Sequence, residues 1–152
     1  MPRNFYIGLL AIVVIGSVIF FYRTEPSVLP VAEFGGVSLR IEYATTSEAK
    51  ERGLSGRTEI QKDYGMLFVF SKDDTYGFWM KDMFVPIDIF WLDSKGQVVY
   101  IAQNVATSTY PNVFYPTTMT RYVLETAAGF AREHNIKIGS KLLLKNLPTV
   151  SQ

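Results

Sequence analysis

The stretch FWMKDMFVPIDIFWL occupies residues 78–92 and is apolar at twelve positions and charged at three. Most of it has the composition of a protein interior, so Lys81, Asp82 and Asp88 require an explanation. Pro86 lacks a backbone donor and suits the entry to a strand, where a donor matters least. The stretch therefore predicts two strands, Tyr76–Lys81 and Ile87–Leu92, joined by a short loop. The sequence Asp-Ser-Lys-Gly at 93–96 predicts a hairpin turn after the second strand.

Alternation along these strands predicts which side chains share a face. Successive side chains of a strand point to opposite faces, so Phe78 and Met80 face one way while Trp79 and Lys81 face the other. Lys81 can lie in a solvated turn or at the rim of a site.

Asp88 is expected on the same face as Phe90 and Leu92. An unpaired buried carboxylate is costly, so it recruits donors or becomes protonated. Arg121 and Glu125, which share a face of a third predicted strand, are candidate neighbours. One arginine and two carboxylates would form either a structural ion network or the polar floor of a binding site, and both interpretations stay open.

The remaining chain adds short strands and two short helices. A capping box at Thr45 and Glu48 predicts the start of the first helix, and Gly53 predicts its end. This pattern predicts an α+β, β-rich small domain: a partly closed barrel of about six or seven short strands. The further strands are expected at 36–45, 65–70, 97–103, 121–125 and 141–145, and the second helix at 127–134.

Residues 5–22 form an uncharged apolar run of eighteen residues, FYIGLLAIVVIGSVIFFY. A helix of that length is about 27 Å long, close to the hydrocarbon thickness of a bilayer. We therefore expect a transmembrane anchor at 1–23, a tether at 24–35 and the β-rich domain at 36–148. The alternative is a cleaved signal peptide, but Phe-Phe-Tyr-Arg is a poor cleavage context. The flanking charges favour a single-pass protein of the cell membrane with a cytoplasmic N-terminus and an extracytoplasmic domain.

Composition excludes several classes of function. The net charge is +1 and the charges are scattered, so no nucleic-acid partner is expected. The chain has no cysteine and its one histidine is His134, which excludes disulfides, thiol catalysis and zinc sites built from histidine and cysteine. No metal or other cofactor is expected.

The segment 96–120 contains no charged residue. Its second half holds Tyr110, Phe114 and Tyr115 beside threonine, serine and asparagine. Aromatic faces with neutral hydrogen-bonding groups suit a neutral glycan, a polyol or a protein partner. Alternatively the segment covers an open side of the barrel and buries its rings.

Five segments of the chain together resemble the domain of unknown function 192 family. The resemblance implies a small β-rich fold and an exported setting, but no reaction. Ser55, Asp82, Met83 and Ser140 depart from the family's pattern. The segments are Arg52-Gly53-Leu54 with Arg57, GMLFVF at 65–70, FWMK at 78–81, PIDIF at 86–90, and YVLE at 122–125 followed by Ala128-Gly129.

We expect a non-catalytic binding or accessory module outside the membrane, with a neutral glycan or an envelope protein as its partner. The alternative is a hydrolase of envelope glycans that uses Asp88 and Glu125 as an acid/base pair, which requires carboxylates about 5–10 Å apart. The candidate ligand-binding residues are Trp79, Lys81, Asp88, Tyr110, Tyr115, Arg121 and Glu125.

Overall fold

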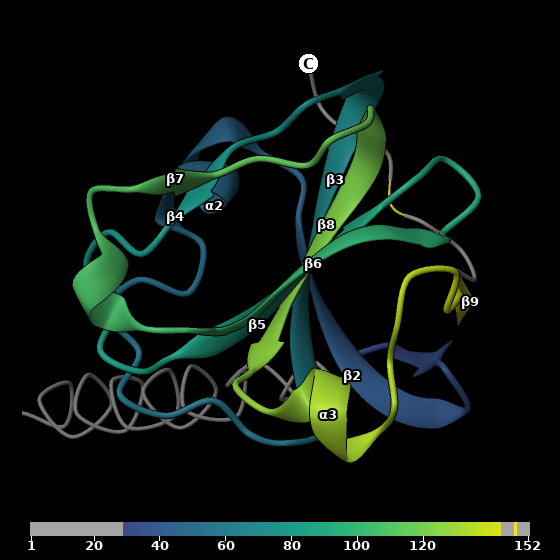
Figure 1. The fold of residues 1–152 in the computed structure, drawn as a ribbon, viewed down its shortest axis with the longest axis horizontal. Helices are drawn as coiled ribbons and strands as arrows, with labels where there is room; N and C mark the ends of the chain where they lie inside the picture. The colour runs from purple at the N-terminus through teal and green to yellow at the C-terminus, as the bar shows by residue number, and fades with distance from the viewer. Residues whose placement is uncertain (1–28, 144–147, 149–152) are drawn as a thin grey trace, which may run out of the picture.

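The computed structural model describes residues 29–143 and 148. Within them the chain forms short strands and two short α-helices, in a β-rich domain (Figure 1). The elements are β1 (Val31–Phe34), β2 (Val37–Ala44), α2 (Ser47–Arg52), β3 (Tyr64–Asp74), β4 (Phe78–Trp79), β5 (Ile87–Leu92), β6 (Val98–Val105), the 3-10 turn η1 (Thr107–Thr109), β7 (Val113–Phe114), β8 (Thr120–Ala127), α3 (Phe130–Glu133) and β9 (Leu142–Leu143).

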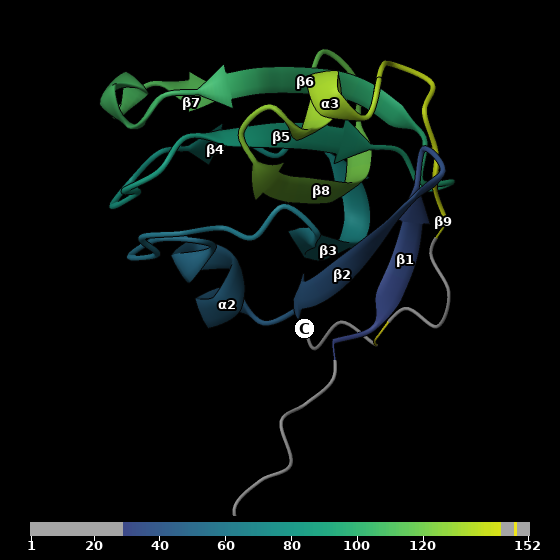
Figure 2. The ribbon, with the colours of Figure 1, turned by 90° about the horizontal axis from the view of Figure 1, so that it is seen from below.

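Seven of the strands form one curled sheet, in the order β6-β5-β8-β3-β2-β1-β9. β2 and β3 are parallel, and the other neighbours are antiparallel. The remaining strands, β4 and β7, form a separate two-stranded ribbon that extends to one side of the sheet (Figure 2).

The curl is closed at one end by the segment 139–143, which we call the closure segment. Leu142 and Leu143 pair with β1, while the backbone N–H groups of Gly139 and Leu142 donate to the carbonyls of Val98 and Gly96. The Val98 N–H donates in return to the Ser140 carbonyl. The closure segment thereby connects β1 to the beginning of β6, which makes the sheet a half-barrel (Figure 2).

Two apolar cores lie on opposite faces of this sheet. The inner core fills the curl and includes Phe34, Phe90 and Leu124, with Phe130 of α3 packed against it. The outer core lies on the other face, under α2 and the ribbon. Its members include Met66, Phe68, Phe78, Ile89, Trp91 and Val123.

β5 is buried on both faces because it separates the two cores. Its bounds are those expected from the sequence, and Ile87, Ile89 and Trp91 share the outer face as alternation predicts. Phe90 and Leu92 lie on the inner face. The expected turn at 93–96 also forms: the Gly96 N–H donates to the Asp93 carbonyl, and Gly96 has a φ of 77°.

The tether boundary expected from the sequence is wrong. Residues 31–34 are strand β1, which pairs with β2 through a two-residue turn at Gly35 and Gly36. Both glycines have positive φ, which such hairpin turns require. The ordered domain therefore begins before Gly36.

Both helices also differ from expectation. Thr46, not Thr45, is the N-cap of α2, and its hydroxyl accepts from the Ala49 N–H at 3.2 Å. The second helix is shorter than 127–134, because β8 extends to Ala127 and Gly129 turns the chain with a φ of 88° before α3 begins.

The expected anchor at 5–22 lies outside the described residues, as do residues 144 and 145 of the last expected strand. Within residues 29–143, no helix has the length and apolarity needed to cross a membrane.

Candidate functional site

A cleft of about 330 Å³ opens on the outer face of the sheet, between the end of α2 and the β4–β7 ribbon. Figures 1 and 2 both place α2 and β4 on the same side of the molecule. The walls come from three separate parts of the chain, and β8 contributes Glu125. The lining residues are Lys50, Glu51, Arg52, Gly53, Leu54, Ser55, Phe68, Phe70, Tyr76, Gly77, Phe78, Trp79, Lys81, Met83 and Glu125.

Glu125 is the buried polar group of the cleft. It lies in a row across the outer face, directly between Met66 of β3 and Ile89 of β5. Its side chain is 4% exposed, and no described residue gives its Oε2 atom a hydrogen bond. Burial raises the pKa of Glu125 to about 8, an effect that the positive charge of Arg57 partly offsets. At neutral pH Glu125 is therefore mainly a neutral carboxylic acid.

The end of α2 approaches this acid closely because residue 53 is glycine. Gly53 caps the helix with a φ of 50°. A Cβ atom there would lie 3.3 Å from Cζ of Phe68 and 3.7 Å from Oε2 of Glu125. A larger residue would crowd the floor of the cleft, and the backbone conformation favours glycine as well.

Aromatic rings form the walls of the cleft. Phe70 and Tyr76 stack with centroids 3.4 Å apart and planes 9° from parallel. The Lys50 ammonium lies 5.0 Å from the Phe70 ring centroid, and the Lys81 ammonium lies 5.9 Å from that of Trp79. These two cations therefore rest against rings of the protein itself.

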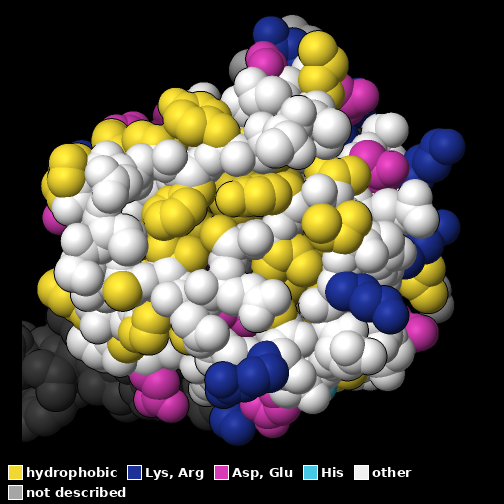
Figure 3. Space-filling model, viewed as in Figure 1, with side chains coloured by type: hydrophobic (Ala, Val, Ile, Leu, Met, Phe, Trp, Pro, Cys, Tyr) yellow, Lys and Arg dark blue, Asp and Glu magenta, His cyan; other side chains and the backbone are white. Residues whose placement is uncertain are grey.

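The expected alternation around Trp79 is confirmed. Phe78 and Met80 are buried, while Trp79 and Lys81 are exposed and line the cleft. Tyr110 lies beside Trp79, with ring centroids 5.8 Å apart. Figure 3 shows apolar side chains gathered over the face that carries β7.

Tyr115 contributes to the same region through Gly77. A Cβ atom on Gly77 would lie 2.5 Å from Cε1 of Tyr115, so the ring packs directly on the glycine backbone. Tyr110 and Tyr115 are both exposed, whereas Phe114 is partly buried against the outer core, so the interpretation that buries the rings of this segment holds for Phe114 alone.

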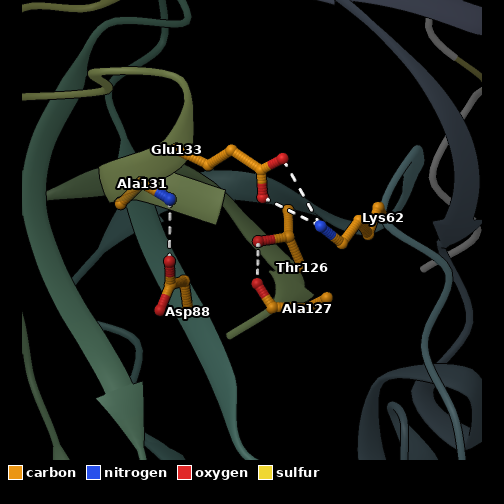
Figure 4. A network of polar contacts seen from close by, with 6 residues as sticks. All are labelled: Lys62, Asp88, Thr126, Ala127, Ala131 and Glu133. Carbon is orange, nitrogen blue, oxygen red and sulfur yellow. Dashed lines mark hydrogen bonds and ion pairs between the residues drawn. The ribbon is translucent and has the colours of Figure 1, made fainter. Parts of the chain in front are cut away.

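Asp88 lies on the other face of the sheet from Glu125. In the β5–β8 pairing Asp88 is opposite Thr126, whereas Ile89 is opposite Glu125, so the two carboxylates point to opposite faces. Asp88 is fully buried and accepts from the backbone N–H group of Asn104 at 2.7 Å. It also accepts from the backbone N–H group of Ala131 at 2.8 Å (Figure 4). Its carboxylate therefore links β6 to α3 and lies outside the cleft.

Arg121 is also separate from the cleft. Its Nε atom pairs with Oδ1 of Asp73 at 2.6 Å, near the surface. Asp88, Arg121 and Glu125 therefore do not lie together, either as the structural ion network or as the polar floor of a site that the sequence left open, and Asp88 and Glu125 point to opposite faces. Sequence spacing does not say which strands become neighbours or which faces they share.

The cleft includes residues that the sequence did not single out as a site. Lys50 and Gly53 come from the end of α2, and Phe68, Phe70 and Tyr76 come from β3 and the turn after it. One signal was present: the Arg52-Gly53-Leu54 segment, read only as a helix end and a family motif.

A second hollow of about 370 Å³ lies near Arg40, Glu42, Arg57 and Tyr64, and these four side chains have partners within the protein. Glu42 accepts from Arg57 at 2.9 Å and from the Tyr64 hydroxyl at 2.6 Å. Burial alone would raise the pKa of Glu42, but these hydrogen bonds outweigh it and lower the pKa. Among the described residues, the buried group that still needs a partner is the Glu125 carboxyl.

The model of the DUF192 family, described as an uncharacterized ACR, matches residues 31–144. No curated protein matches the chain. The matched range includes the cleft and the whole half-barrel.

Two of the solved structures that resemble this one are the following. A protein of unknown function from Novosphingobium aromaticivorans DSM 12444 has a TM-score of 0.70 and 29% sequence identity, over 80% of this chain and 94% of that one. A protein from Sinorhizobium meliloti 1021, provisionally described as a transcription regulator, has a TM-score of 0.69 and 26% identity, over 74% of this chain and 88% of that one.

Proposed function

The chain belongs to the DUF192 family, and on that premise we propose that it is a binding module that holds a neutral, hydroxyl-bearing ligand in the cleft above Glu125. The observation that carries this proposal is the buried Glu125 carboxyl, which lines the cleft without a hydrogen-bond partner among the described residues. Native proteins rarely leave a buried polar atom unpaired, so its partner is expected to be a ligand group.

The protonation state of Glu125 determines which kind of ligand group can pair with it. A carboxylic acid donates one hydrogen bond and accepts others, as a hydroxyl group also does. A carboxylate would instead favour a cation, but the pKa of about 8 keeps the floor uncharged at neutral pH. A sugar hydroxyl therefore complements Glu125.

The walls of the cleft fit the same ligand. Tyr76 and Trp79 offer rings against which the C–H face of a sugar can pack, whereas Phe70 already stacks on Tyr76 and carries the Lys50 ammonium. Lys50 and Lys81 already rest on two of these rings, and a neutral ligand leaves those contacts in place. A neutral glycan of the cell envelope is the ligand class that can both hydrogen-bond to the Glu125 carboxyl and pack on the aromatic rings.

We propose further that residues 5–22 hold this module at the outer face of the cell membrane, with the N-terminus in the cytoplasm. The support is the uncharged apolar run with arginine at either side. A tagged full-length chain should sediment with membranes, and protease added to intact cells or spheroplasts should remove the C-terminal domain. Recovery of the intact chain in the soluble fraction would contradict the anchor.

Tryptophan fluorescence tests the cleft directly. The chain has two tryptophans, of which Trp91 is fully buried and Trp79 is 47% exposed in the cleft, so a ligand should change mainly the Trp79 emission. The full-length chain, in a detergent without a sugar headgroup, is titrated with a panel of neutral envelope glycan fragments. Saturable binding to at least one of them is expected.

Variants at Glu125 test whether the ligand binds at this carboxyl group. Glu125→Gln keeps a neutral donor and acceptor and should bind within a few-fold of wild type. Glu125→Leu removes both and should weaken binding by about 1–3 kcal/mol, roughly tenfold to a hundredfold. Glu33→Gln, an exposed glutamate of β1 outside the cleft, is the matched control and should not change the affinity. Equal affinity of Glu125→Leu and wild type would show that the ligand does not bind at this acid.

A further inference from the structure

The β4–β7 ribbon carries apolar residues on both of its faces. Phe78 is opposite Phe114 and Trp79 is opposite Val113 in the register. The inner face packs on the outer core: Phe78 contacts Phe68 edge to face, with centroids 4.7 Å apart. On the outer face, Trp79 and Val113 remain 47% and 39% exposed.

Tyr110 and Tyr115 continue this exposed surface on the same connection. Their exposed fractions are 46% and 57%, and they lie beside Trp79 and Gly77 respectively. We call Trp79, Tyr110, Val113 and Tyr115 the aromatic ledge. In Figure 3 the apolar groups near β7 are surrounded mainly by backbone atoms and uncharged side chains.

The ledge has the composition of a recognition surface rather than of a solvated turn. Large apolar side chains exposed together mark interaction sites. Tyr110, Val113 and Tyr115 belong to the segment 96–120, which contains no charged residue and offers neutral hydrogen-bonding groups on threonine, serine and asparagine. The fourth member, Trp79, already has the Lys81 ammonium against its ring. The surface therefore favours an uncharged occupant.

Continuity with the cleft identifies that occupant. Trp79 lines the cleft and also contacts Tyr110, so the cleft and the ledge share one side chain. A ligand that reaches Glu125 and extends past Trp79 meets Tyr110 next. Gly77 also lines the cleft, and the Tyr115 ring packs on its backbone. This contact holds the Tyr115 ring beside the same wall of the cleft.

We propose that the ligand is a neutral oligosaccharide of at least two units, with one unit in the cleft above Glu125 and the following units packed on the aromatic ledge. This inference rests on the proposed function, because it extends the same ligand outward from the cleft. Tyr110 and Tyr115 are then binding residues for the second and later units, and Glu125 contacts only the first.

A chain-length series tests the inference separately from the proposed function. Neutral oligosaccharides of one to four identical units, taken from the sugar that binds in the cleft, are titrated into the full-length chain in the sugar-free detergent. Wild type should gain about tenfold in affinity between one and three units, since each aromatic contact contributes about 0.5–1.5 kcal/mol.

Two variants should separate the subsites. Tyr110→Ala with Tyr115→Ala should bind one unit as wild type does and lose the gain with length. Glu125→Leu should weaken binding at every length. Ile138→Ala replaces an apolar side chain that is 67% exposed on the turn before the closure segment and is the matched control. It should leave the whole series unchanged.

A failure of the proposed function and a failure of this inference give different results. If no unit binds at all, the proposed function is wrong. If one unit binds through Glu125 but longer chains bind no more tightly, or if the two tyrosine substitutions leave the gain intact, the inference is overturned and the function stands. Aromatic rings also suit a membrane interface. Quenching of Trp79 by brominated lipid acyl chains, with the full-length chain in vesicles, would assign the ledge to lipid and overturn the inference.

Discussion

Glu125 and Asp88 show how two buried carboxyl groups on neighbouring strands acquire different surroundings. Asp88 accepts hydrogen bonds from two backbone N–H groups. Glu125 receives no hydrogen bond at Oε2 and lies on the face of the outer core, so burial raises its pKa and keeps it mainly neutral. The difference comes from the face of the sheet and from the segments that cover each face.

The raised pKa of Glu125 predicts a pH dependence of stability with a definite sign. An unfolded glutamate has a pKa of 4.5 and the folded one about 8, so between these values the folded state holds one more proton. The contribution is fully present below pH 4.5 and is lost as the pH rises through 8. Glu125→Gln lacks this dependence.

Chemical denaturation at several pH values between about 5 and 9 measures the effect. The free energy of unfolding of Glu125→Gln should rise relative to wild type across this range, by a few kcal/mol in order of magnitude. The exposed Glu51→Gln serves as the control and should run parallel to wild type. A constant difference between Glu125→Gln and wild type would mean that Glu125 is ionised in the folded protein throughout.

At the scale of the element, two adjacent threonines at the start of α2 have different roles. Thr46 accepts from the Ala49 N–H, while Thr45 makes no such contact in the structure. Thr46→Ala should therefore lower the free energy of unfolding by about 1 kcal/mol. Thr45→Ala is the matched control and should cost less. Thermal or denaturant unfolding measures both variants, and a larger loss at Thr45 would place the helix start one residue earlier.

Elements whose borders depend on local chemistry could be predicted from the sequence. β5 was predicted because Pro86 precedes it and a turn at Asp93–Gly96 follows it. β1 was missed because four residues carry little periodicity, although Gly35 and Gly36 were a hairpin signal. The second helix was predicted too long because nothing local to Ala127 reveals that β8 continues beside β5 and β3.

The candidate site could be predicted only in part, for a related reason. Alternation identified Trp79 and Lys81 as outward-facing, and Glu125 was among the candidate ligand-binding residues. The cleft itself depends on α2 and the ribbon meeting over β3 and β8, and these segments are distant in the sequence. Asp88 was paired with Glu125 because both are acidic residues of predicted strands, but the register places them on opposite faces.

At the scale of the whole molecule, closure of the half-barrel depends on the last described residues. The closure segment connects β1 and β6 through backbone hydrogen bonds, and Leu142 is buried in the inner core. Each such bond contributes about 0.5–1.5 kcal/mol and burial of a leucine about 1.5–3 kcal/mol. Without this segment the two edges of the sheet are open.

A chain that ends at residue 137 lacks the closure segment, with its backbone hydrogen bonds and the buried Leu142 side chain. Its free energy of unfolding should therefore be several kcal/mol lower than that of a chain that ends at residue 143. Denaturant titration of the two chains gives the difference directly. Hydrogen exchange should also become faster at the amides of Val98 and Gly35, which donate to the closure segment. Equal stability of the two chains would show that closure contributes little.

The placement of the two cores affects how this domain can diversify. The side chains that surround the proposed ligand belong to the outer face, whereas the side chains that hold the curl together belong to the inner one. Mutations can therefore accumulate around Lys50–Ser55 and Tyr76–Trp79 without altering the interior of the curl. Descendants of one ancestral domain could acquire different ligand specificities in this way. A laboratory library of variants confined to those two segments would test which changes the fold tolerates.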